Sequence, residues 1–341
     1  MRTGAAILAT ALLVAAFQDA SAQTLPPPPG GGLGLPLDCD FATLCSIQNY
    51  VDTRPGPEAA DWRCGHHAYN GDRGADFRLP DEETMQRGVA VTAVAAGTVR
   101  AVRDGMRDIS FEHPAAPDIT GREAGNAVVL THEDGWETQY SHMRNGSVAV
   151  KVGDRVAAGE KLGLVGLSGR TEFPHVELQV RHNGTVIDPF SGRAAESGCE
   201  GAVRPLWTAA AAAALPYREA VALCVDFAIN APRRELIDRA CPRATLVERT
   251  AQALVLFASI SGPAAGDRGR IVITGPDGGT VVDHSETIPS NKAVWFQFAG
   301  ARQPGRDWPA GTYTGRFELT RSRPDGGTVT LLQQTRQVEI R

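Results

Sequence analysis

The chain has 341 residues, 42% of them hydrophobic, so it can bury a sizeable core and we expect two domains. The net charge of -5, with arginines balanced by carboxylates, gives no electrostatic basis for binding nucleic acid.

The first residues are typical of a secretory signal peptide. Arg2 precedes an apolar run from Ala5 to Phe17, and Ala20-Ser21-Ala22 offers small residues for cleavage. The run is too short for a comfortable membrane span. We therefore expect residues 1–22 to be removed, and the protein to be secreted or periplasmic, with no transmembrane segment in the mature chain.

Residues 23–38 predict a tether. Four prolines, Pro26 to Pro29, precede three glycines, Gly30 to Gly32, and the segment has no hydrophobic period. We expect ordered structure to begin near Cys39.

The six cysteines are typical of an exported protein with disulfide bonds. Their even number favours three bridges, and the absence of a Cys-x-x-Cys pair argues against a zinc–thiolate cluster. Several connectivities are possible for six cysteines. Proximity in the sequence favours Cys39–Cys45 and Cys224–Cys241, which leaves Cys64–Cys199 to tie the start of the first domain to its end.

Residues 39–205 predict an antiparallel β domain. Short strands are indicated at 89–94 and 98–102, which would form a hairpin with Gly97 at the turn, and at 126–132, 136–143, 148–154 and 156–163. Residues 104–125 have no period and predict a long surface loop that forms a cleft wall. The frequent turns argue against a βαβ fold.

The remaining residues predict a connector and a second domain. We expect short helices at 209–214 and 232–240, within a connecting segment at residues 206–245. Residues 246–341 contain further short strands and predict a smaller β-sandwich. The segment from Trp308 to Tyr313 resembles the entry to a late strand of immunoglobulin-like modules, and we expect such a module to bind or dock.

The stretch from Phe173 to Val180 predicts the floor of a site. Val176, Leu178 and Val180 alternate with His175, Glu177 and Gln179, so a histidine and a carboxylate share the polar face of one strand. Two interpretations remain open on this pattern alone. The strand forms the floor of a metal or acid–base site, or it is an edge strand with an ordinary solvated face.

From Cys64 to Phe190 the chain resembles the lysostaphin/LytM-type zinc peptidases, which cut peptides of bacterial peptidoglycan. The landmarks occur in the order seen in that family: Arg73 to Phe77, Gly88 to Ala93 with Gly97 to Val99, Asn126 to His132, Gly135 to His142, Val152 to Val156, Ser168-Gly169, and Pro174 to Glu177. The resemblance implies an all-β chain with an antiparallel LytM-type domain.

The resemblance also implies roles for five residues. His142 and His175 match the two histidines that assist the reaction, and Asp76 matches a zinc ligand. The other two ligand positions hold Asp72 and Glu177, where the family has histidine in both places. Three carboxylates suit calcium, magnesium or manganese better than zinc, and they make a bound ion a poorer Lewis acid.

Two hypotheses of function follow. The first is a peptidase-like module that is not catalytic and that binds peptidoglycan peptides or regulates a cell-wall hydrolase as its partner. The second is an active metalloendopeptidase with an unusual ligand set, and His66 or His67 is then a candidate substitute ligand. The non-catalytic hypothesis predicts that the site holds no zinc, and that it holds either a hard divalent cation or no metal. A carbohydrate-binding sandwich protein would not explain the ordered motifs.

Overall fold

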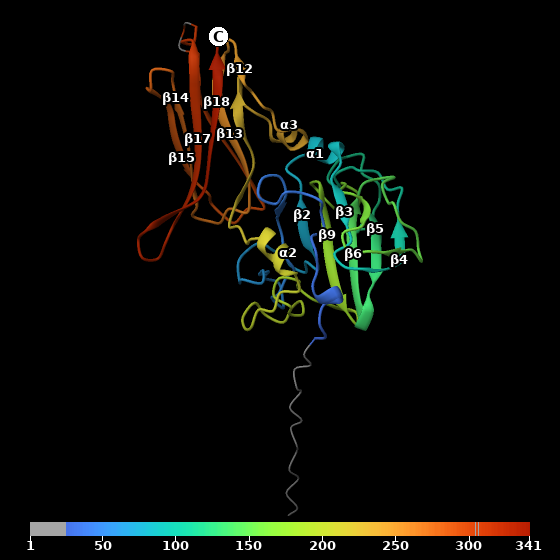
Figure 1. Cartoon of the computed structure of the whole chain (residues 1–341). Coiled ribbons are helices and arrows are strands. Elements are labelled where there is room, and N and C mark those ends of the chain that lie inside the picture. The colour runs from blue at the N-terminus through green and yellow to red at the C-terminus, as the bar shows by residue number, and fades with distance from the viewer. Residues whose placement is uncertain (1–24, 304, 306) are drawn as a thin grey trace, which may run out of the picture.

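The structure is a computed structural model that describes residues 25–303, 305 and 307–341 (Figure 1). The predicted signal peptide lies outside the described residues. Two β units follow one another along the chain, the first drawn mainly in blue and green and the second in orange and red. Within the described part of the chain, no helix has the length and apolar character needed to cross a membrane.

The first unit is built on an eight-stranded sheet whose strand pairs are all antiparallel. The strand order is β1-β2-β9-β6-β5-β4-β7, β10 pairs with β9, and β3 and β8 form a separate two-stranded sheet. The bounds are β1 (Ser46–Ile47), β2 (Ala75–Arg78), β3 (Ala90–Thr92), β4 (Gly97–Arg103), β5 (Asn126–Thr131), β6 (Trp136–Met143), β7 (Arg155–Val156), β8 (Lys161–Leu164), β9 (His175–His182) and β10 (Thr185–Val186).

The central strands β6 and β9 follow the alternation of the sequence. Val176, Leu178 and Val180 are at most 1% exposed and belong to the core of the first unit. The polar residues of β9 face the other side of the sheet, as the pleat of a strand requires. Because β9 lies between β2 and β6, it is not an edge strand, and that interpretation of its polar face is wrong.

The hairpin expected around Gly97 does not form. β3 pairs with β8, while β4 pairs with β5 and β7. After β3, the Ala93 amide donates to the Glu160 carbonyl (2.9 Å) and the Val94 amide to the Tyr140 hydroxyl (2.8 Å). These long-range bonds occupy the backbone that a local hairpin would have used.

The described part of the proline and glycine segment is packed against the first unit, so the prediction that order begins near Cys39 is wrong. Leu33 and Leu37 are at most 1% exposed and lie in the core. Leu33 exchanges backbone hydrogen bonds with Leu206 (2.8 Å) and Thr208 (2.9 Å). These two buried leucines make the apolar contacts that hold the segment against the first unit, and its proline and glycine content gave no sign of them.

Helices within residues 25–303, 305 and 307–341 are few and short. They are η1 (Pro29–Gly31), α1 (Glu82–Arg87), η2 (Glu133–Gly135), α2 (Ala209–Ala214) and α3 (Arg234–Arg239). Asp81 caps α1 by accepting a hydrogen bond from the Thr84 amide, and Glu82 and Glu83 complement the positive end of the helix dipole. The second oxygen of Asp81 accepts from the Cys241 amide (3.0 Å), which links α1 to the segment after α3.

The second unit consists of two sheets packed around one core. One sheet has the order β11-β13-β16 and the other β12-β18-β17-β14-β15. The bounds are β11 (Val221–Ala228), β12 (Leu246–Val247), β13 (Ala253–Ser261), β14 (Arg268–Thr274), β15 (Thr280–Thr287), β16 (Val294–Arg302), β17 (Gly311–Ser322) and β18 (Thr328–Ile340). Residues from both sheets, including Leu256 and Phe317, are fully buried together.

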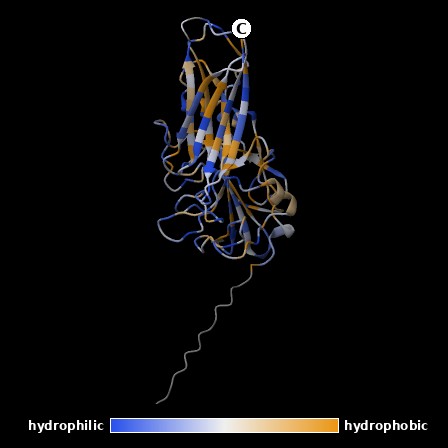
Figure 2. Ribbon diagram, turned by 90° about the vertical axis from the view of Figure 1, so that its left-hand side faces the viewer, coloured by the Kyte–Doolittle hydropathy of each residue, from blue (hydrophilic) through white to orange (hydrophobic). Residues whose placement is uncertain are grey.

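Hydrophobic and hydrophilic residues alternate along the strands of this unit (Figure 2). The segment expected to be a connector contains the two short helices and also β11, a strand that the sequence did not predict. β11 pairs with β13 along its whole length, so its stability comes from a tertiary partner.

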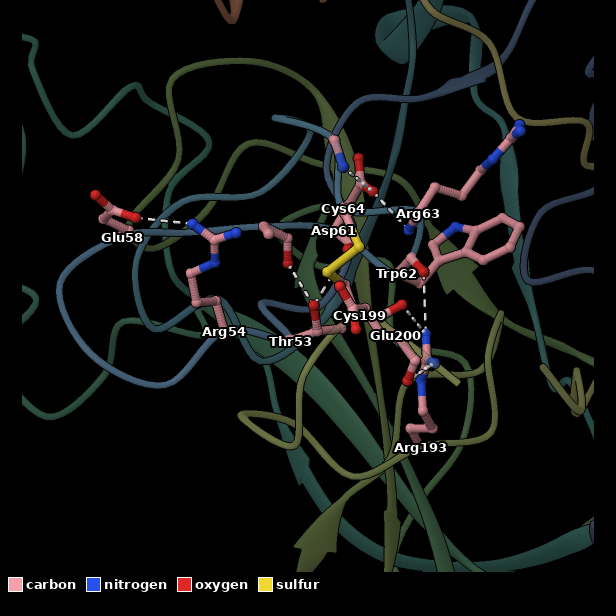
Figure 3. The surroundings of a disulfide bond; sticks show 12 residues. Thr53, Arg54, Glu58, Asp61, Trp62, Arg63, Cys64, Arg193, Cys199 and Glu200 are labelled. Atoms are coloured by element: carbon pink, nitrogen blue, oxygen red, sulfur yellow. Dashed lines mark hydrogen bonds and ion pairs between the residues drawn. A yellow bond between two sulfur atoms is a disulfide. The ribbon is translucent and has the colours of Figure 1, made fainter. Parts of the chain in front are cut away.

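The three disulfides predicted from the sequence are confirmed: Cys39–Cys45, Cys64–Cys199 and Cys224–Cys241. Figure 3 shows Cys64–Cys199, which joins residues 135 positions apart. Beside this bridge, the Arg193 guanidinium donates to the carbonyls of Trp62 (3.0 Å) and Cys199 (2.8 Å). The covalent bond and these hydrogen bonds hold the two ends of the first unit together.

Candidate functional site

The floor of the site is made by three neighbouring strands, β2, β9 and β6. Their register places Asp76 opposite Glu177, and Glu177 opposite Ser141. The chain before β2 must lie close to Glu177, because a Cβ atom on Gly74 would be 2.4 Å from the Glu177 Cγ atom. Glycine at position 74 therefore permits the close approach of Asp72 and Asp76 to β9.

His142 reaches this face through an unusual backbone conformation. Strict alternation would place it on the face opposite Ser141, but its φ of 62° lies in the left-handed region. Pairing of β6 with β9 ends at Ser141, and the His142 amide donates to the Ala124 carbonyl (2.9 Å) instead. Such a conformation costs about 1–3 kcal/mol in a non-glycine residue and is concentrated at functional sites.

The two imidazoles lie side by side, and both present Nε2 to the site. Their ring centroids are 4.6 Å apart. His142 Nδ1 is 2.8 Å from the Ser168 carbonyl oxygen and His175 Nδ1 is 2.9 Å from the Phe173 carbonyl oxygen. A carbonyl accepts only, so both Nδ1 atoms carry the proton, and both Nε2 atoms are acceptors in the neutral rings.

Burial keeps both rings neutral at pH 7. Burial, together with the nearby His175, lowers the pKa of His142 to about 4. Burial likewise lowers the pKa of His175 to about 4. The Nε2 atoms face carboxylates, since His142 Nε2 is 3.7 Å from Glu177 Oε2 and His175 Nε2 is 3.5 Å from Asp76 Oδ1. Because the imidazoles are neutral at pH 7, these two contacts are not ion pairs between opposite charges.

The three carboxylates are buried together, and each holds its proton more tightly than usual. Burial raises the pKa of Asp76 to about 7, although the hydrogen bond from Asn49 (2.8 Å) and the charge of Arg78 oppose the increase. Burial raises the pKa of Asp72 well above its ordinary value, and the charges of Asp76 and Glu177 add to that increase. Burial also raises the pKa of Glu177.

One oxygen of Asp72 lacks a hydrogen-bond partner among the described residues. Asp72 is 1% exposed, and its Oδ1 accepts from the Gly74 amide (3.2 Å). The oxygen without a partner among the described residues is Oδ2, which is buried. A buried oxygen in this state costs free energy comparable to a lost hydrogen bond.

The residues present do not fit zinc. No three His, Cys, Asp or Glu side chains within residues 25–303, 305 and 307–341 are arranged to hold one ion. The three side chains that the sequence predicts as ligands, Asp72, Asp76 and Glu177, are all carboxylates, whereas zinc sites normally include imidazole or thiolate.

The structure brings together the five residues predicted from the sequence, but not the two further histidines considered as substitute ligands. His66 Nε2 is 3.0 Å from the Gly262 carbonyl oxygen of the second unit, and His67 stacks on His66 with ring centroids 4.6 Å apart. Both rings therefore pack at the junction of the two units.

Sequence reasoning missed three residues around the site: Asn49, Ser141 and Arg78. Asn49 could not be found, because its segment comes next to β2 only in the folded chain. The other two carried a signal. Arg78 shares the polar face of its strand with Asp76, two residues earlier, and Ser141 precedes the predicted His142.

Comparison with known proteins identifies the domain that contains this site. The model of Peptidase family M23 matches residues 71–189. The DD-carboxypeptidase/endopeptidase Mpg of Neisseria meningitidis serogroup B is 34% identical over 109 residues, which cover 31% of this chain and 22% of that protein. The peptidoglycan DD-endopeptidase ShyA of Vibrio cholerae is 31% identical over 85 residues, which cover 25% of this chain and 17% of that protein.

The chain thus spans about a fifth of the length of these curated relatives. Among solved structures, the catalytic domain of lysostaphin from Staphylococcus simulans is similar over 44% of this chain and 91% of that domain, with 23% identity and a TM-score of 0.29. The matched segment includes Asp72, Asp76, His142, His175 and Glu177. Residues 71–189 are a domain of peptidase family M23.

Proposed function

We propose that this chain is an exported cell-envelope protein whose M23 domain binds peptidoglycan peptides and does not cleave them. One observation carries the proposal. In the resemblance to the zinc peptidases, Asp72 and Glu177 take positions at which that family has histidine, so the proposed ligand set consists of three carboxylates. Added negative charge also makes a bound ion a poorer Lewis acid, which weakens its activation of water.

The same site retains features that suit peptide binding. Two neutral imidazoles carry Nε2 acceptors on the polar face of the sheet, and the amide N–H groups of an extended peptide can donate to such acceptors. The relatives include a peptidoglycan DD-endopeptidase, which supports peptidoglycan as the source of the peptide. In this proposal residues 1–22 are a cleaved signal, residues 39–205 bind, and residues 246–341 form an immunoglobulin-like module that docks a cell-wall hydrolase.

The second candidate is an active metalloendopeptidase. It is favoured by the geometry of His142 and His175, which still converge on the carboxylates at 3.7 and 3.5 Å. In this case the domain would cleave peptidoglycan peptides with an unusual ligand set. Both candidates predict binding, and they differ in whether soluble fragments are released.

Co-sedimentation with isolated peptidoglycan sacculi tests the proposal. We expect the protein to pellet with the sacculi and to release no soluble peptide fragments. The variant His142→Ala with His175→Ala should bind about tenfold more weakly, because it loses two hydrogen-bond acceptors. His284→Ala, at an exposed residue of β15, is the matched control and should bind as the parent does.

Each result assigns the function. Fragments released by the parent, and lost in the double histidine variant, would replace the proposal with the metalloendopeptidase. Failure of the parent to pellet would reject both candidates.

A further inference from the structure

Arg78 is a buried cation without an ion pair. It is 3% exposed, and no Asp or Glu oxygen of the described residues lies within 4.0 Å of its guanidinium nitrogens. Its Nε donates to the Leu79 carbonyl (3.2 Å) and its Nη1 to the Gln48 side-chain oxygen, and both acceptors are neutral. Buried arginines are almost always paired with an anion, so this one lacks its usual partner.

The guanidinium lines a cavity that continues the floor of the site. The cavity has a volume of about 200 Å³ and includes Gln48, Arg78, Glu172 and Phe173 in its walls. The Phe173 ring packs against the guanidinium at 4.5 Å and stacks on His175 with ring centroids 4.5 Å apart. Arg78 is also directly opposite His175 in the pairing of β2 with β9. Phe173 therefore connects the cavity to the site, because its ring contacts both Arg78 and His175.

The second unit lines this cavity as well. Arg234 and Asp238 of α3 and Val294 of β16 form part of its walls. Arg234 Nε is 3.3 Å from Asp238 Oδ2. The Asp238 charge also opposes the lowering of the Arg78 pKa that burial causes. A peptide lying over His175 would meet these walls at one end, where a chain terminus fits better than a continuing chain.

We propose that this cavity binds the C-terminal carboxylate of a peptide, with the Arg78 guanidinium as its partner. The inference rests on the proposed function, since it names the end of the peptide that the M23 domain recognises. A planar guanidinium is well matched to a carboxylate, and its Nη2 makes no hydrogen bond to the described residues.

The charges of the cavity restrict the ligand further. Glu82 and Glu172 also line it, and neither is within ion-pair distance of a cation among the residues that the structure describes. Two carboxylates near one guanidinium would repel a second negative charge. The cavity therefore suits a peptide end that carries a single carboxylate.

The test compares two forms of one probe. Calorimetric titration is performed with a synthetic peptidoglycan stem tetrapeptide that has a free C-terminal carboxylate, and with the same peptide as its C-terminal amide. We expect the full-length mature protein to bind the free acid at least tenfold more tightly. Arg78→Met should bind both forms equally, while Arg87→Met, which removes an exposed arginine of α1, should keep the preference.

Equal binding of the two forms by the parent would overturn the inference and leave peptide binding by the domain intact. Binding of neither form would overturn the proposed function and this inference together. If Arg78→Met does not fold, Glu172→Gln serves as the second variant. It removes a repelling charge, so it should strengthen binding of the acid form severalfold and leave the amide form unchanged, and the absence of that difference would also overturn the inference.

Discussion

Replacing Asp76 with asparagine should stabilise the first unit at pH 8. The folded state raises the pKa of this carboxyl from its ordinary value of 3.8 to about 7. The difference corresponds to about 4 kcal/mol, because each pKa unit is worth about 1.4 kcal/mol. The folded pKa is higher than the unfolded one. The contribution of Asp76 to the free energy of unfolding is therefore fully present below pH 3.8 and is lost as the pH rises through 7.

Asparagine keeps the contacts of the carboxyl without its charge. Its oxygen can accept from Asn49, as Asp76 Oδ2 does now (2.8 Å), and its amide can donate to the free Nε2 of His175. We therefore expect Asp76→Asn to raise the free energy of unfolding at pH 8 by up to about 4 kcal/mol, and to change it little at pH 4.

Urea unfolding followed by tryptophan fluorescence, at pH 4 and pH 8, measures this effect. Glu133→Gln, at an exposed carboxylate of the same unit, is the control and should follow the parent at both pH values. The reasoning would be refuted if Asp76→Asn were less stable than the parent at pH 8, or if its stability varied between the two pH values as much as that of the parent.

Three further results are expected. The double variant Asp72→His with Glu177→His should gain zinc-dependent stability, about 2.7 kcal/mol at a hundredfold excess of zinc over the dissociation constant, and a folded variant without a zinc response would show that these residues are not at the family's ligand positions. Removing the Cys64–Cys199 bridge with serines should lower the free energy of unfolding by about 5 kcal/mol, because it opens a loop of 135 residues, and denaturant unfolding would show a negligible change if the bridge contributes little. Intact-mass analysis of secreted protein should show cleavage after Ala22 and a gain of about six hydrogens on reduction, whereas a retained N-terminus would contradict export by this signal.

The sequence predicted the floor of the site well, because the floor depends on local alternation. Val176, Leu178 and Val180 alternate with polar residues, and that pattern alone placed His175 and Glu177 on one face. The three disulfides followed from spacing and the even number of cysteines.

The rest of the site depends on contacts that a local pattern does not contain. The left-handed backbone of His142 arises where its strand leaves β9 and bonds to Ala124. The packing of Leu33 and Leu37 depends on distant strands and on the segment before α2. The cavity beside Arg78 needs walls from both units. Such features come from tertiary structure, which overrides local propensity.

The zinc content of the mature protein, purified without chelator and measured by elemental analysis, tests the central claim most directly. A site of three carboxylates that does not fit zinc predicts that no stoichiometric zinc remains after purification and that sacculi are bound without being cleaved. One tightly held zinc per chain, together with release of peptide fragments from sacculi, would contradict the account and establish the domain as an active peptidase.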